Sequence, residues 1–105
     1  MHIPESDWKK FRPLRDKALA NLCDKVLTAI TATTANDALS SHQKYLKIYD
    51  EIQHYDEQIG LIFDGYSRSL ALSQLAMIQS HHLLEPEEFA GLSASTREYL
   101  AQCHL

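Results

Sequence analysis

Residues 45–70 read YLKIYDEIQHYDEQIGLIFDGYSRSL, and this stretch decides the fold class. Apolar and aromatic side chains recur in it at intervals of three and four residues, which predicts an amphipathic α-helix that breaks near its end. At about 100° per residue, the row falls within an arc of roughly 140° on one helix face. Its members are Tyr45, Ile48, Tyr49, Ile52, Tyr55, Ile59, Ile62, Phe63, Tyr66 and Leu70.

A second apolar row upstream predicts a helix from Pro13 to about Thr33 that packs against the first. Because Pro13 disfavours helical backbone at the residue before it, we expect a kink or break there, preceded by a short helix from Asp7 to Phe11 capped by Ser6. The second row consists of Ala18, Leu19, Leu22, Cys23, Val26, Ala29 and Ile30.

Downstream signals predict three more helices. A polar tract over residues 31–41 forms the main connection and offers candidate N-caps at Asp37, Ser40 and Ser41. A new apolar phase after Gly65 favours a separate helix over residues 66–82, although Gly60 and Gly65 leave either a bent helix or a corner open. Pro86 opens a short helix to Ala90, and Ser93 caps the last one over residues 95–102.

These elements predict an all-α fold: a single domain over residues 1–105 that forms a compact bundle of five or six helices with one long central amphipathic helix. A straight helix over residues 42–64 would be about 35 Å long, which exceeds what a 100-residue globule covers. The helix therefore bends, or its far end packs on another copy of the chain.

Composition narrows the function classes. The chain has 105 residues, of which 45% are hydrophobic and 23% charged, as in a soluble globular protein. A formal net charge of −4 argues against general nucleic-acid binding. Residues 1–35 hold six Lys and Arg against four Asp and Glu, whereas residues 36–67 hold two against six. No stretch approaches the roughly 18 apolar residues that span a bilayer, and two cysteines without metal-ligand spacing suit a reducing compartment, so we expect a cytoplasmic protein with no membrane partner.

Three short stretches resemble a group of small, uncharacterised bacterial helical proteins. They are PESDWK at residues 4–9, PEEF at residues 86–89 and TRE at residues 96–98. The resemblance implies a bacterial cytoplasmic protein and transfers no catalytic or binding residue.

Three charged residues fall within apolar faces. Arg15 lies near the centre of the apolar face of the helix predicted from Pro13, Asp56 lies within the row of residues 45–70, and Arg68 extends the apolar phase of the helix after Gly65. Their signs are compatible, so an architectural salt bridge between them is the simpler interpretation. The functional alternative is that the two arginines leave one positive charge free in a cleft, where it binds a carboxylate or phosphate.

Tyrosines are the second candidate feature. Tyr45, Tyr49, Tyr55 and Tyr66 all lie in the long apolar row, and tyrosine is common both in cores and at protein interfaces. We expect core packing for most of them. The excess length of the helix nevertheless favours a contact between copies of the chain.

The sequence contains only incomplete motifs for metal binding or catalysis. Glu51-x-x-His54 is half of the pattern that holds two metals in helical bundles, and no second half follows. Adjacent histidines at 81 and 82 diverge on a helix, and Cys103-His104 has no further ligand spacing. Cys23 lies in an apolar arc without an activating neighbour, which suits a core thiol. We therefore predict no catalytic residue, metal or cofactor.

The sequence thus favours a non-enzymatic helical interaction module, whose partner is itself or another protein, and which forms a homodimer through part of residues 45–66. The first alternative is a sensor or enzyme that binds a small anion through Arg15, Asp56 and Arg68. A weaker alternative is contact with a phosphate backbone through Lys9, Lys10 and Arg12.

Overall fold

The computed structural model describes residues 2–103, and every regular element in that range is helical. The elements are α1 (Glu5–Thr34), α2 (Ser41–Phe63), α3 (Arg68–Ser80), the short 3₁₀ helix η1 (Pro86–Phe89) and α4 (Ala94–Gln102). The predicted all-α class is confirmed. The number of helices is not, because the described residues form four α-helices rather than five or six.

The predicted break at Pro13 is wrong. α1 runs without interruption from Glu5 to Thr34 with Pro13 inside it, and no side chain caps its first turn. The ring of Pro13 faces solvent, whereas Phe11 and Ala18 on either side of it in sequence are fully buried. Burial of the flanking side chains therefore offsets the hydrogen bond that proline cannot donate.

The two turns that flank α2 follow local rules that the sequence predicts. Ser40 caps α2 by accepting a hydrogen bond from the Gln43 backbone amide, and the Gln43 side chain accepts one from the Ser40 amide. After Phe63 the chain turns at Gly65, whose φ of +80° suits glycine. A Cβ at Gly65 would also lie 2.8 Å from Leu70 Cδ1, so the Leu70 side chain would have to shift to admit one. The turn separates α2 from α3 as two helices.

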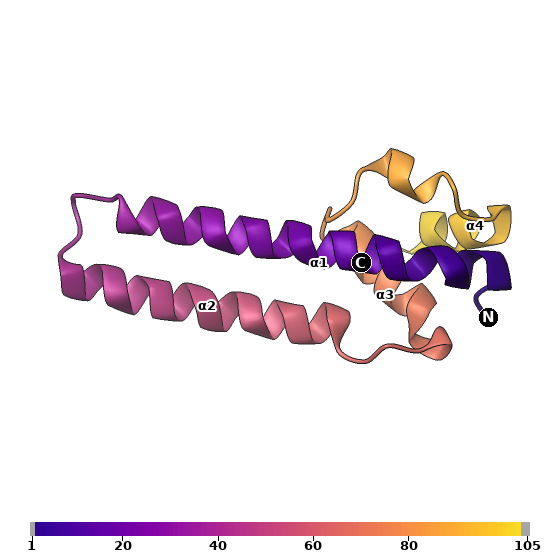
Figure 1. Ribbon diagram of the computed structural model, residues 1–105, viewed down its shortest axis with the longest axis horizontal. Coiled ribbons are helices and arrows are strands. Elements are labelled where there is room, and N and C mark those ends of the chain that lie inside the picture. The colour runs from indigo at the N-terminus through magenta and orange to yellow at the C-terminus, as the bar shows by residue number, and fades with distance from the viewer. Residues whose placement is uncertain (1, 104–105) are drawn as a thin grey trace.

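The hydrophobic core lies around the first half of α1. There α3, η1 and α4 gather with the last turn of α2, as Figure 1 shows. The buried hydrophobic residues are Ile3, Phe11, Ala18, Leu22, Ile62, Phe63, Ala71, Leu72, Leu75, Ala76, Ile78, Leu83, Leu84, Phe89, Leu92 and Leu100. We call this part of the molecule, residues 2–22 and 62–103, the head.

A buried carboxylate joins the two ends of the head. Asp7 of α1 is fully buried and accepts hydrogen bonds from the Ser93 amide (2.8 Å), the Ser93 hydroxyl (2.6 Å) and the Thr96 hydroxyl at the start of α4. Burial raises the pKa of Asp7, but these hydrogen bonds, together with Lys10, outweigh it and hold the pKa below its ordinary value of 3.8. The ionised carboxylate therefore stabilises the contact between α1 and α4.

Residues 23–61 form a two-helix hairpin that extends from the head, and we call it the arm (Figure 1). The molecule measures 52 × 24 × 23 Å, so the expectation of a compact bundle is wrong. Thr33 is the one fully buried residue in the arm, and no hydrophobic residue there is buried to the same degree. Between the head and the tip, α1 and α2 have each other as neighbours but no third helix, which leaves part of each apolar row uncovered.

Candidate functional site

The candidate site is one side of the arm, on which large hydrophobic side chains face solvent. The exposed fraction is 60% for Leu27, 65% for Tyr45, 53% for Tyr49 and 48% for Ile52. Ile30 and Cys23 lie beside them and are half-buried. Burial of such side chains is a main source of stability, so their exposure together is informative where single exposed residues are not. We call these six residues, Cys23, Leu27, Ile30, Tyr45, Tyr49 and Ile52, the open face.

Helical geometry puts all six on the same side of the arm. In each arm helix, some apolar residues face the other helix and the open-face residues lie to one side of them. Viewed along the helix axis, the open-face residues are rotated by about 60–130° from the inward-facing ones, in the same rotational sense in both helices. Two antiparallel helices are related by an approximate twofold axis, and equal offsets then point to the same side of the hairpin. The open face is therefore continuous across α1 and α2 rather than two separate strips.

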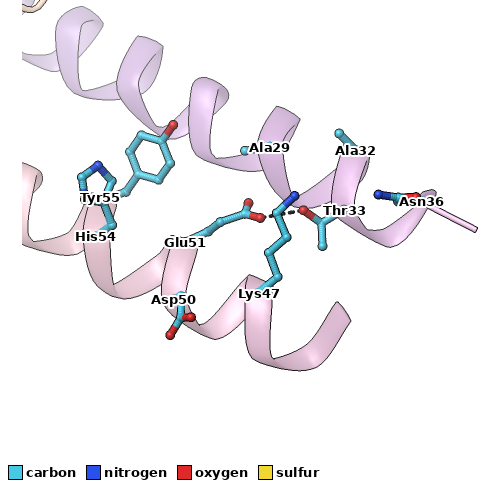
Figure 2. A pocket seen from close by; sticks show the side chains of 9 residues that line it. All are labelled: Ala29, Ala32, Thr33, Asn36, Lys47, Asp50, Glu51, His54 and Tyr55. Carbon is cyan, nitrogen blue, oxygen red and sulfur yellow. Dashed lines mark hydrogen bonds between the residues drawn. The ribbon is translucent and has the colours of Figure 1, made fainter. Parts of the chain in front are cut away.

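The opposite side of the arm carries a polar cleft of about 600 Å³. Figure 2 shows Glu51 and Tyr55 of α2 reaching toward α1, whereas Asp50 points away from it. Lys47 and His54 also line the cleft. The two sides of the arm thus differ in their side chains: the open face carries large hydrophobic residues, whereas the cleft is lined by alanines, polar residues and side chains of both charges. The remaining lining residues are Ala29, Ala32, Thr33 and Asn36.

Glu51 is the most constrained group in the cleft. Its Oε1 accepts a hydrogen bond of 2.6 Å from the Thr33 hydroxyl (Figure 2). Its Oε2 is buried and has no hydrogen-bond partner among the described residues. This arrangement fixes the register of α1 against α2 near the tip of the arm. It also places the predicted Glu51-x-x-His54 pair on the polar side of the arm, away from the open face.

The structure brings Arg15, Asp56 and Arg68 into three separate environments. Arg15 is half-buried and donates to the Phe63 carbonyl (2.6 Å) and to Gln74 Oε1 (3.3 Å). Arg68 is exposed and pairs with Glu5 at 2.6 Å. Asp56 is exposed on α2 and has no ion pair or hydrogen bond within residues 2–103. No contact links the three charges to one another in that range.

Both arginines instead hold the turn between α2 and α3 against α1. Arg15 lies over the ring of Tyr66, 5.7 Å from its centroid, and Arg68 lies over Trp8 at 5.5 Å. The ring of Tyr66 is stacked on that of Phe11, with centroids 6.0 Å apart, and packs at a tilt of 33° against Trp8, with centroids 5.1 Å apart. Two members of the predicted ion cluster, Arg15 and Arg68, therefore lie at an aromatic junction where the arm meets the head, and Asp56 does not.

The four candidate interface tyrosines divide between arm and head. Tyr45 and Tyr49 lie on the open face, and Tyr55 is half-buried between the arm helices and lines the polar cleft. Tyr66 belongs to the aromatic junction, although 47% of it is exposed. Leu27 lies outside the apolar arc of α1, so the spacing of apolar residues does not predict it as part of a contact surface. Its position one turn from Cys23 and Ile30 is the signal that would have found it.

Two findings on the described residues concern metal-ligand groups and helices long enough to span a membrane. No group of three or more His, Cys, Asp or Glu side chains gathers within residues 2–103 in a way that suits a metal ion. His104 of the Cys103-His104 pair lies outside the described residues. Among the helices described, none has the length and apolar character needed to cross a bilayer.

Comparison of the chain with protein-family models, curated proteins and solved structures gives no match.

Proposed function

We propose that this protein is an interaction module that works by protein contact rather than catalysis, and that the open face of the arm is its contact surface. One observation carries the proposal: four large hydrophobic side chains, each about half or more exposed, lie together on one side of a two-helix arm. An exposed apolar patch of this kind is typical of a protein–protein interface.

The composition of the open face supports contact with a folded protein surface. Tyr45 and Tyr49 provide large apolar area with a polar tip and few rotatable bonds, which makes tyrosine a frequent anchor at interfaces. Leu27 and Ile52 add aliphatic area between them. Arg15 donates a hydrogen bond to the Phe63 carbonyl in the last turn of α2, which anchors the base of the arm to α1.

Site-specific photocrosslinking in cells tests the proposal. Leu27 or Tyr49 is replaced, one at a time, by the photoreactive amino acid p-benzoylphenylalanine. The matched control position is Leu61, which is 69% exposed and lies about 120° from Tyr49 around α2. We expect a defined covalent protein adduct from positions 27 and 49 and none from position 61. No adduct from the open face, or equal adducts from all three positions, would refute the proposal.

A further inference from the structure

The exposed side of α2 has a symmetric spacing about Ile52. Tyr45 lies seven residues before Ile52, and the half-buried Ile59, which continues the row beyond the open face, lies seven residues after it. A surface of this kind suits a twofold interface, in which the same patch is used by both partners and must complement itself. We infer that the occupant of the open face is a second copy of this chain, with its arm pointing the opposite way. This inference rests on the proposed function and names its partner.

The register of the arm places the symmetry axis. Arg15 bonds the Phe63 carbonyl at the base of the arm, and Lys44 bonds the Thr34 carbonyl at 2.8 Å near the tip. Interpolation over these two contacts and the Thr33–Glu51 hydrogen bond puts about residue 28 of α1 opposite Ile52. Leu27 and Ile52 are therefore neighbours across the open face. An axis that passes beside both of them brings each one against its own copy.

Two arms related by this axis make a four-helix bundle. The axis lies in the interface and crosses the arms, so α1 packs on the partner's α1 and α2 on the partner's α2. Each helix is then antiparallel to both of its neighbours, which is the arrangement of up-and-down bundles. The bundle supplies the neighbouring layer that the arm lacks. The two heads lie at opposite ends and do not collide.

The area of the whole side of the arm that carries the open face is close to what a dimer interface needs. Residues 41–61 of α2 span about 30 Å, and two adjacent helices are about 20 Å wide. The flat area of one side of the arm is then about 600 Å², and ridges of side chains increase the accessible area. A stable protein interface buries about 800 Å² per partner, so the side of the arm is close to sufficient by itself.

Asp56 favours the antiparallel arrangement. It lies on the open side of α2 between Ile52 and Ile59, exposed and without a partner within residues 2–103. With the axis at Ile52, Asp56 lies opposite the partner's Tyr49. The Tyr49 hydroxyl accepts a hydrogen bond from Gln53 (2.9 Å), and its own proton is free to be donated to a carboxylate. Parallel arms would instead press Asp56 against Cys23 and Leu27, which leaves a charge unpaired.

Sedimentation equilibrium on the purified protein tests self-association. We expect a dimer for the unmodified chain and for Leu61→Glu. Ile52→Glu puts two like charges beside the axis, so we expect at least a tenfold increase in the dimer dissociation constant. Circular dichroism checks that both variants keep their helices. A chain that stays monomeric at all concentrations while positions 27 and 49 crosslink to another protein overturns the inference and leaves the proposed function standing. A monomer without any crosslink overturns both.

Disulfide trapping tests the orientation. In a chain with Cys23→Ala and Cys103→Ala, we expect Ile52→Cys to form a disulfide with its own copy under mild oxidation, as does Leu27→Cys. Tyr45→Cys is the control, since its copy lies about 20 Å away in this arrangement and cannot be reached. A mixture in which Leu27→Cys couples to Ile52→Cys, with neither variant coupling to itself, shows parallel arms and overturns the proposed geometry.

Discussion

At the scale of single residues, Asp7 shows how one carboxylate ties together positions 86 residues apart in sequence. A carboxylate in the first turn of α1 looks like an ordinary partner for the helix dipole. In the fold it is instead fully buried and accepts three hydrogen bonds from Ser93 and Thr96. Sequence spacing contains no sign of this contact, because it depends on how α4 returns to α1.

We predict that Asp7→Asn lowers the free energy of unfolding by about 2–4 kcal/mol, since hydrogen bonds to a buried charged group are the strong ones. The pKa of Asp7 is lowered on folding, so its contribution is complete above the unfolded value near 3.8 and is lost as pH falls through the folded value. Denaturant titrations at pH 7 and pH 3 measure both effects. The exposed Asp16→Asn is the matched control, and an Asp7→Asn stability equal to that of the control would contradict the prediction.

At the scale of elements, α1 shows that a helix breaker in the sequence does not always end a helix. Local chemistry predicts a boundary at Pro13, yet the residues on either side of it pack into one core and keep the helix continuous. The missing hydrogen bond is a local cost, whereas the burial of Phe11 and Ala18 is a gain that only tertiary packing supplies.

Because Pro13 leaves one hydrogen bond of α1 unmade, we predict that Pro13→Ala stabilises the protein. Alanine restores the backbone donor inside α1 and removes the clash of the ring, so we expect the free energy of unfolding to rise by about 1–3 kcal/mol in urea denaturation. Ala20→Gly, at another exposed position of α1, is the comparison and should lower it by about 1 kcal/mol. A loss of stability in Pro13→Ala would mean that the proline contacts stabilise the head.

At the scale of the whole molecule, stability is divided unevenly between head and arm. The buried hydrophobic residues lie in the head, whereas Thr33 is the one fully buried residue of the arm. Regions with few buried apolar contacts open without global unfolding. The arm is therefore the part of the molecule whose stability depends most on a partner.

Hydrogen exchange provides the measurement. In the Ile52→Glu variant at low concentration, we expect amides of residues 28–34 and 44–52 to exchange at least tenfold faster than amides of α3. In the unmodified chain at high concentration, dimer formation should slow the arm amides, because binding stabilises the folded arm. Equal exchange rates in the arm and the head of the variant would show that the arm is stable by itself.

Sequence alone determines the local structure of this protein. Apolar spacing predicts the helices, and the capping box at Ser40, the cap at Ser93 and the turn after Phe63 follow from the chemistry of a few neighbouring residues. The open face is partly visible in sequence too, since Tyr45, Tyr49 and Ile52 belong to the row that decides the fold class.

Tertiary structure alone decides what lies opposite each helix face. Periodicity shows that a helix has an apolar side but not whether the chain is long enough to cover it. The helices α3, η1 and α4 pack only around the first half of α1 and the last turn of α2. Ile62 is therefore buried, whereas Ile52 on the same helix is not. For the same reason Arg15 contacts a carbonyl and aromatic rings, and Asp56 faces solvent. Contacts between residues distant in sequence make that division, and no local pattern encodes them.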